Sequence, residues 1–430
     1  MSSAPSILCL YSSGSNARGQ LATGDTDDAH TFSPCLFLRA PPGRLPDGTT
    51  AVLNVACGAN HTLALLARGE TREVWGCGDG RSGQLGPSYA REDSEGAGSA
   101  SVFRPLDLRA AGSEGYVPRL VAAGWETSYV VFSCPGKSDV LISMGADDFG
   151  NRGGGGIAVT LSVCRVPLLG AFSDLPVGEH TLAVRALSAG PHHVVVVVSL
   201  TVVGGSTTEA LVGWGAARHG QLGSAMSGTQ TVPAIQNLPR AIHMDGTQYT
   251  PGSVSHSALG NRHTAFLHSS AKVSGIGSNK KSQLALLDSI EGARGVACTW
   301  NGTYVLTRCG SEDQVVATGS NSHGQLGQAT AEPCGDLRRV DFPSSTGPRR
   351  ILKLACGSEH VLCLVEAIDG EGTRREVWGW GWNEHGNLGT GATEDVHAPL
   401  RIYPTAGSNA ANRVVDVWGG NGTSWIVVER

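Results

Sequence analysis

A nine-residue phrase led by glycine returns seven times along this chain of 430 residues, and its period constrains the fold more than any other feature. The phrase reads approximately G-x-N-x-x-G-Q-L-G, and its copies are GSNARGQLA from Gly14, GDGRSGQLG from Gly78, GADDFGNRG from Gly145, GAARHGQLG from Gly215, GSNKKSQLA from Gly277, GSNSHGQLG from Gly319 and GWNEHGNLG from Gly381. Successive copies start 64, 67, 70, 62, 42 and 62 residues apart. Short apolar runs at this period cannot bury their hydrophobic faces one unit at a time, so the period predicts repeats that stack or close into a ring.

A second phrase recurs in phase with the first and completes the repeat. Its copies are ACGANHTLAL from Ala56, AAGWETSYVV from Ala122, SAGPHHVVVV from Ser188, ALGNRHTAFL from Ala258, ACTWNGTYVL from Ala297, ACGSEHVLCL from Ala355 and VWGGNGTSWI from Val417. With the runs between and beyond the two phrases, each repeat offers about four strand-length segments of apolar and β-branched residues separated by turn residues. Four strands in each of seven repeats predict an all-β, seven-bladed β-propeller.

Both ends of the chain fall inside a repeat. The chain opens with the run Ile7-Leu8-Cys9-Leu10 before the first glycine turn and ends with Ser424-Trp425-Ile426-Val427-Val428. We expect two inner strands from the C-terminus and two outer strands from the N-terminus to complete one blade, which closes the ring and removes an exposed sheet edge. The unbroken period predicts a single domain over residues 1–430.

The composition is that of a chain with a packed core. Hydrophobic residues make up 40% and charged residues 16%, so we assign the 60 glycines to turns rather than to a disordered chain. Residues 91–101 and 204–209 are expected to form surface loops. No segment has the length of a membrane-spanning helix or the pattern of a secretion signal, so we expect a location in the cytoplasm or nucleus.

The eleven cysteines do not predict a metal site or a disulfide framework. Cys57, Cys298 and Cys356 occupy one equivalent repeat position, and no C-x-x-C pair occurs. We therefore expect structural thiols, and neither a bound metal nor a cofactor.

The sequence also lacks the local patterns of an enzyme. GDGRSG from Gly78 satisfies G-x-G-x-x-G, but it is a copy of the repeat turn and no helical pattern follows it. His61, His193, His263 and His360 recur at one repeat position, which indicates a role in the fold. H-E-x-x-H, Walker and G-x-S-x-G patterns are not present. We expect a protein that is not an enzyme, with catalytic residues assembled from loops as the alternative.

Tryptophans depart from the repeat. The position after the repeat glycine carries, in chain order, Ala59, Trp125, Pro191, Asn261, Trp300, Ser358 and Gly420. Because the position is equivalent, Trp125 and Trp300 are expected on the same face of the disc, with Glu126 beside the first. Exposed aromatic residues there would suit a protein-binding hot spot. The alternative is that each tryptophan caps its own blade.

Three further tryptophans stand in the run Trp378-Gly379-Trp380-Gly381-Trp382. Trp378 matches Trp75 of an earlier repeat, so we assign it to the core. Trp380 and Trp382 approach the loop, and with Glu384 we group them with the predicted partner-binding residues.

The two phrases together resemble those of the regulator-of-chromosome-condensation repeat family over essentially the whole chain, and that family is built from seven-bladed propellers. Within it the irregular copies, such as Gly124-Trp125-Glu126-Thr127 and Ala297-Cys298-Thr299-Trp300, resemble the fungal alpha-tubulin suppressor group, killer-toxin-insensitivity factors that act with the Elongator complex. The inserted Trp382-Asn383 departs from that group, as do the loops from Arg91 and Gly204.

This resemblance implies a non-catalytic partner protein. The expected partner is a small zinc-containing electron carrier, the third diphthamide biosynthesis protein. The pair would support wobble-uridine modification of tRNA by Elongator and diphthamide synthesis, with the metal on the carrier and no direct contact of this chain with nucleic acid or membrane.

Two other functions known in the family are alternatives. One is guanine-nucleotide exchange on a small nuclear GTPase with chromatin binding, but chromatin binding favours a basic arm and this chain has a net charge of -5. The other is a ubiquitin-ligase or kinase-linked repeat module, which would need a further domain.

Overall fold

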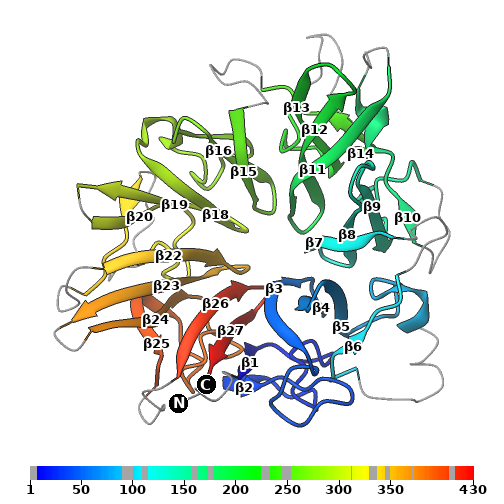
Figure 1. Ribbon diagram of the computed structural model, residues 1–430. Coiled ribbons are helices and arrows are strands. Elements are labelled where there is room, and N and C mark those ends of the chain that lie inside the picture. The colour runs from blue at the N-terminus through cyan, green and yellow to red at the C-terminus, as the bar shows by residue number, and fades with distance from the viewer. Residues whose placement is uncertain are drawn as a thin grey trace.

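Seven β-sheets are arranged around a common centre in the computed structural model of the chain (Figure 1). The structure describes residues 7–89, 100–108, 115–156, 163–172, 178–223, 233–244, 253–310, 312–328, 337–343, 349–369, 372–405 and 412–430. The prediction of an all-β, seven-bladed propeller is confirmed. The expected loop over 91–101 lies mostly outside the described residues, whereas Gly204 and Gly205 form the turn between two strands.

Blades are numbered here by the chain order of their innermost strands. Blade 1 contains β3 (Thr49–Cys57), β4 (His61–Arg68), β5 (Thr71–Gly78) and β6 (Arg104–Pro105). Blade 2 contains β7 (Val117–Ala123), β8 (Thr127–Ser133), β9 (Val140–Gly145) and β10 (Cys164–Arg165). Blade 3 contains β11 (His180–Ala189), β12 (His193–Val202), β13 (Thr207–Ala216) and β14 (Ile235–Ala241). Blade 4 contains β15 (Val254–Leu259), β16 (His263–His268) and β17 (Val273–Gly277). Blade 5 contains β18 (Ala293–Thr299), β19 (Gly302–Cys309), β20 (Glu312–Gly319) and β21 (Arg338–Arg339). Blade 6 contains β22 (Arg349–Cys356), β23 (His360–Asp369), β24 (Gly372–Gly381) and β25 (Val396–Tyr403). Blade 7 contains β26 (Arg413–Gly419), β27 (Thr423–Glu429), β1 (Leu8–Gly14) and β2 (Ala29–Pro34), and the short 3-10 helices are η1 (Leu168–Ala171) and η3 (Leu287–Ser289).

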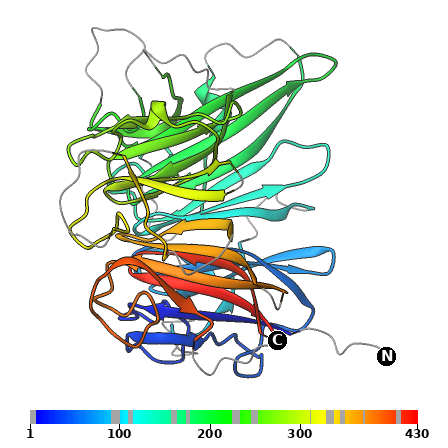
Figure 2. The ribbon, with the colours of Figure 1, turned by 90° about the vertical axis from the view of Figure 1, so that its left-hand side faces the viewer.

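Strands in every blade are antiparallel, and the second strand is covered on both faces because each blade packs between two others. In β12 the run from Val194 to Val198 is buried throughout. Continuous apolar runs are typical of strands that are buried on both sides. The core is therefore a series of apolar layers between neighbouring blades, whose ribbons Figure 2 shows from the side.

Blade 7 closes the ring with strands from both ends of the chain. Its order is β2-β1-β27-β26, and β1 pairs with β27 from Leu8 opposite Glu429 to Gly14 opposite Thr423. One further pair of hydrogen bonds joins Ile7 to Arg430, at 3.0 and 2.9 Å. The two-plus-two closure predicted from the sequence is confirmed.

Blade 4 has three strands, which corrects the expectation of four in every blade. The copies of the first phrase around it start only 42 residues apart, so few residues separate Gly277 at the end of β17 from Ala293 at the start of β18. Those residues form a turn and η3, and Leu287 and Ile290 bury their side chains in the core in place of a fourth strand.

The two repeated phrases lie on one face of the disc, which we call the loop face. Both phrases end or begin strands at this face, since His61 of β4 pairs with Gly78 of β5. In every blade the amide after the turn glycine donates to a carbonyl of the other phrase, as from Asp79 to Asn60 at 2.7 Å and from Trp382 to Glu359 at 2.9 Å. Side chains of both phrases are thereby held on the same side of the ring.

The recurring histidines join neighbouring blades. The Nε2 atom of His61 lies 2.9 Å from Ser128 Oγ in the next blade, and His193 makes the equivalent contact with Thr264 at 2.9 Å. Burial lowers the pKa of His61 to about 4 and that of His193 to about 3. These rings are therefore neutral at pH 7.

The structure corrects the alignment of the last repeat by one residue. The amide of Gly420 donates to the carbonyl of Thr423, as Gly58 does to His61 in blade 1. Asn421, rather than Gly420, is thus the residue after the repeat glycine in blade 7, and Thr423 stands at the histidine position.

Removing residues 423–430 should abolish the cooperative thermal unfolding transition. The deletion removes β27, whose residues Trp425, Ile426 and Val428 are fully buried. Burial of each side chain of this size contributes about 1.5–3 kcal/mol. The loss of all three therefore approaches the net unfolding free energy of a typical domain, which is about 5–15 kcal/mol. Circular dichroism measures the transition. A circular permutant with joined ends, opened between Gly69 and Glu70, keeps β1 and β27 and should unfold cooperatively; a cooperative transition in the deletion would contradict closure by blade 7.

Stability should fall as the pH is lowered from about 6.5 to 4. The histidine pKa is about 6.5 in an unfolded chain, and burial lowers it to about 4 in His61, His263 and His360. The unfolded state therefore binds protons in this range while the folded state does not, and each such histidine lowers the unfolding free energy by about 1.4 kcal/mol per pH unit.

Denaturant titrations across this pH range measure the effect. His61→Gln should reduce the slope of the unfolding free energy against pH by about 1.4 kcal/mol per pH unit, the contribution of one proton. Leu63→Ala removes a fully buried side chain of the same strand and should lower stability without altering the slope. Equal slopes in His61→Gln and the unmodified chain would contradict the assignment.

Candidate partner-binding face

Trp125 and Trp300 stand in equivalent loops of blades 2 and 5, and their backbones are fixed by hydrogen bonds that run from blade to blade. The amide of Trp125 donates to the carbonyl of Pro191 at 2.8 Å, and the amide of Trp300 donates to the carbonyl of Ser358 at 2.7 Å. The carbonyl of Trp125 in turn accepts from Ala59 at 2.8 Å. Because the backbone at this position links the blades, the side chain is free to serve another purpose.

The two indole rings meet over the centre of the disc. Their centroids are 5.7 Å apart and their planes are inclined by 51°, although blades 2 and 5 are three places apart in the ring. The prediction that both rings lie on one face is confirmed. Trp125 is 36% exposed and Trp300 is half-buried, so together they present an aromatic surface at the centre of the loop face.

His192 and Phe149 extend this surface outward. The His192 ring lies 6.2 Å from Trp125 and 4.3 Å from Phe149, which is 39% exposed. Burial lowers the pKa of His192, partly opposed by the charge of Asp148, so the imidazole is neutral at pH 7. We call Trp125, Trp300, His192 and Phe149 the aromatic cluster.

Glu126 lies beside the aromatic cluster, as its place in the sequence requires. Its carbonyl accepts a hydrogen bond from Ala146 at 2.9 Å, which holds the loop. Arg81 lies close enough to interact electrostatically with Glu126, but its guanidinium pairs with Asp79 at 2.6 Å. Within the described part of the chain the Glu126 carboxylate makes no hydrogen bond, so it can accept one from a partner.

The structure does not support Trp380 as a contact residue. Its side chain is fully buried in β24, and its Nε1 donates to the carbonyl of Gln325 at 2.9 Å. Trp214 has the same position in blade 3, where its Nε1 donates to the carbonyl of Asn151 at 2.8 Å. Trp380 is therefore a core residue. The prediction that Trp378 is a core residue is confirmed.

Trp382 lies on the loop face, because it follows the turn glycine of blade 6. It is half-buried, and its Nε1 donates to Glu384 Oε2 at 3.3 Å. The rings of His385 and His323 stand edge-on to it, at 5.3 and 6.3 Å. Trp382 and Glu384 thus form a second exposed group, and Glu384 itself is exposed.

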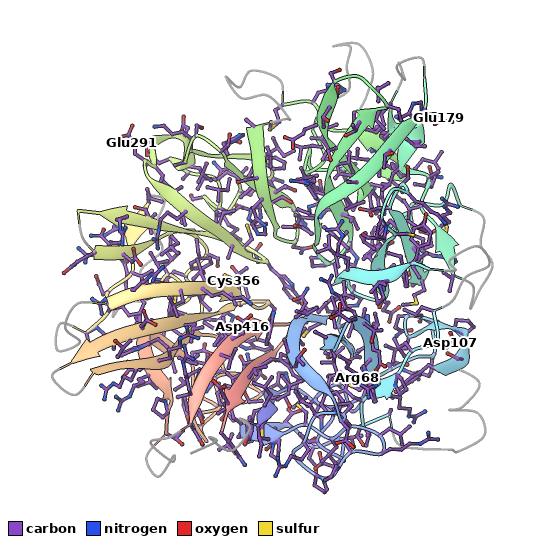
Figure 3. All side chains as sticks on the ribbon, viewed as in Figure 1. Arg68, Asp107, Glu179, Glu291, Cys356 and Asp416 are labelled. Carbon is purple, nitrogen blue, oxygen red and sulfur yellow. The ribbon has the colours of Figure 1, made fainter. Side chains whose placement is uncertain are left out.

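Beneath the aromatic cluster lies a small cavity of about 100 Å³ at the centre of the ring. Trp300 lines it together with Cys57, Cys298 and Cys356, and Figure 3 shows Cys356 near the centre. Burial raises the pKa of Cys57 and Cys298 to about 12, so these thiols are protonated at neutral pH. Among the described residues, no group of three or more histidine, cysteine or acidic side chains is placed to hold a metal ion.

Sequence reasoning missed His192 and Phe149. His192 precedes the repeat histidine His193, and Phe149 occupies the variable centre of the turn phrase GADDFGNRG. The available signal was a phenylalanine at a turn position where the other copies carry arginine, serine, lysine or histidine. Their contact with Trp125 depends on how neighbouring loops converge, which the repeat does not encode.

Comparison with known proteins identifies the repeat. The profile described as "Regulator of chromosome condensation (RCC1) repeat" matches residues 9–65, 312–364 and 376–427, and a second profile of that description matches 52–84. The chain is 25% identical to the ultraviolet-B receptor UVR8 of Arabidopsis thaliana over 98% of this chain and 83% of the receptor. It is 26% identical to the secretion-regulating guanine nucleotide exchange factor of Mus musculus over 91% of this chain and 78% of that protein.

A fungal relative and a solved structure cover nearly the whole chain. The RCC1 repeat-containing protein C10F6.04 of Schizosaccharomyces pombe is 24% identical, over 98% of this chain and 99% of that protein. The crystal structure of Prp20p from Saccharomyces cerevisiae superposes with a TM-score of 0.69 at 18% identity, over 99% of this chain and 92% of Prp20p. That structural likeness supports the propeller fold. Within the described residues no helix is long and apolar enough to cross a membrane.

Replacing Trp125 by alanine should lower stability far less than replacing Trp380 by alanine. Trp125→Ala removes a side chain that is 36% exposed, so the unfolding free energy should fall by less than about 1 kcal/mol. Trp380→Ala leaves a cavity in the core and should cost about 3–5 kcal/mol. Denaturant unfolding of both variants measures the difference. A loss of about 3 kcal/mol or more in Trp125→Ala would identify that residue as a blade cap.

Proposed function

We propose that the chain is an RCC1-repeat protein that binds a partner without catalysis, and that this partner covers the loop face at the aromatic cluster. The contact between Trp125 and Trp300 carries this proposal. Large aromatic side chains at the centre of a surface are enriched among residues that dominate the free energy of protein association.

The form of the aromatic cluster supports a macromolecular partner. Its rings lie above a cavity of only about 100 Å³, which is smaller than a typical small-molecule pocket. Glu126 stands at the edge of the rings with an unpaired carboxylate, which would add a polar contact to an apolar centre. This arrangement matches the usual division of an interface into an apolar core and a polar rim.

We propose further that the partner is the small zinc-containing electron carrier of diphthamide synthesis, and that the pair supports tRNA wobble-uridine modification by Elongator. The irregular repeats around Trp125 and Trp300, which resemble the fungal alpha-tubulin suppressor group, support this identity. The S. pombe RCC1 repeat protein matches over nearly the full length of both chains, which is compatible with it. In this proposal the metal is held by the partner.

Guanine-nucleotide exchange is a second candidate function. It is favoured by the similarity to the secretion-regulating guanine nucleotide exchange factor of the mouse, which extends over 91% of this chain. A net charge of -5 gives the chain no general affinity for the phosphates of chromatin.

Capture of partners on the immobilised chain, followed by mass spectrometry, should identify a small zinc protein. Trp125→Ala and Trp300→Ala should each weaken its binding by about 2 kcal/mol or more, the range of interface hot spots. Isothermal titration calorimetry with the purified carrier measures the affinity. Leu238→Ala, at a residue of β14 that is 42% exposed, is a matched control and should leave the affinity unchanged.

The same chain should leave nucleotide release from a small nuclear GTPase at its spontaneous rate. Strong acceleration, together with failure to bind the zinc carrier, would establish the exchange function instead. Binding of the carrier with undiminished affinity to both tryptophan variants would place its contact surface elsewhere.

A further inference from the structure

A groove of about 400 Å³ opens on the loop face next to the aromatic cluster, at the junction of blades 2, 3 and 4. Phe149 and His192 of the aromatic cluster form part of its wall, with Ala216 and Ile235 of blade 3. Ile235 is 44% exposed and Phe149 is 39% exposed, so this wall offers an apolar surface to solvent. The groove is thus an extension of the aromatic cluster and not an isolated hollow.

The facing wall of the groove is cationic. Arg218 from the turn phrase of blade 3 and Arg262 from the second phrase of blade 4 line it, and both are exposed. His219 lies between them. Burial lowers the pKa of His219, and the charges of Arg262, Lys280 and Arg218 lower it further, which shows that three cations converge on this point.

These cations are not neutralised within the described part of the chain. Neither Arg218 nor Arg262 takes part in an ion pair or donates a side-chain hydrogen bond there, unlike Arg81, which is held by Asp79. Unpaired guanidinium groups beside an apolar wall are costly to leave without an anion once the groove is covered. An occupant that covers the groove would therefore have to bring anionic groups, such as carboxylates, to pair with these arginines.

We propose that this groove binds an acidic segment of a partner protein, in which an apolar side chain packs on Phe149 and Ile235 while neighbouring Asp or Glu carboxylates pair with Arg218 and Arg262. The inference deepens the proposed function, since it specifies the chemistry of the segment that lies beside the aromatic cluster. Arginine pairs with carboxylates through two parallel hydrogen bonds, which would fix the direction of the segment in the groove.

Charge favours a peptide over a nucleic acid as the occupant. The cations form a compact group rather than a stripe that could follow a phosphate backbone. The Glu126 carboxylate beside the aromatic cluster would repel a polyanion that extended past the groove. A short acidic segment that ends near the aromatic cluster meets no such repulsion.

Selection of a displayed library of short random peptides on the folded chain tests the proposal without knowledge of the natural partner. Enriched peptides should combine Asp or Glu with an adjacent aromatic or aliphatic residue. Arg218→Glu with Arg262→Glu should weaken their binding at least about tenfold, measured by fluorescence anisotropy with labelled peptides. Arg218→Gln with Arg262→Gln should also weaken it, which separates loss of pairing from repulsion.

Arg72→Glu with Arg350→Glu changes the net charge equally at exposed arginines elsewhere on the chain and should leave binding unchanged. Enriched peptides without acidic residues, an absence of enrichment, or equal binding to the Arg218 and Arg262 variants would overturn the proposal. Tighter binding of a single-stranded oligonucleotide at the same arginines would replace it with a nucleic-acid site. Capture of the zinc carrier is measured separately, so either the proposed groove site or the proposed identity of the partner can be disproved without the other.

Discussion

The ring depends on a steric fit between a glycine and a histidine at the inner end of most blades. A Cβ atom on Gly58 would lie 2.0 Å from Cε1 of His61, and the same distance separates Gly260 from the His263 ring. The absence of a side chain lets the imidazole lie flat against the backbone, where its Nε2 reaches a hydroxyl of the next blade. The G-x-x-H pattern is therefore one structural unit, since any side chain at the glycine would displace the histidine ring.

Blades 2, 5 and 7 lack this histidine and replace it in a consistent way. In each of them the residue two positions further along the strand is a fully buried aromatic: Tyr129, Tyr304 or Trp425. The Tyr304 hydroxyl lies 3.2 Å from where a Cβ of Gly302 would be, so it occupies the space of the missing ring, and it donates to the carbonyl of Gln325 at 2.8 Å. Tyr129 does the same with Asn151 at 2.7 Å. Inward packing in these blades thus comes from the third residue of the second strand instead of the first. Two of the three preceding loops, in blades 2 and 5, carry the exposed or half-buried Trp125 and Trp300.

The fold was predictable from the sequence because each repeat carries its own turn glycines and strands, and because the partial repeats at the two ends add up to one blade. The three-stranded blade 4 was not predicted, although the 42-residue spacing leaves fewer residues for that blade. Two errors have local physical causes. Consecutive glycines at 419 and 420 leave the register of the last phrase ambiguous in the sequence, and the pairing of Gly419 with Ser424 and the hydrogen bond from Gly420 to Thr423 fix it. Trp380 was placed with the loop residues, yet its alternation with Trp378 puts both side chains on one face of β24, and this face is buried.

The candidate site was predictable only in part, since sequence equivalence places Trp125 and Trp300 on one face but cannot give their separation. That separation depends on how the loops converge over the central cavity, which small residues such as Ala123 and Gly190 line. The cationic groove needed even more tertiary information, since Arg218 and Arg262 come from different phrases of different blades and meet only because the loops of both phrases are tied together at every blade. The same hydrogen bonds that make the repeat regular therefore bring its irregular residues together, and recognition can vary on this face while the ring beneath it stays the same.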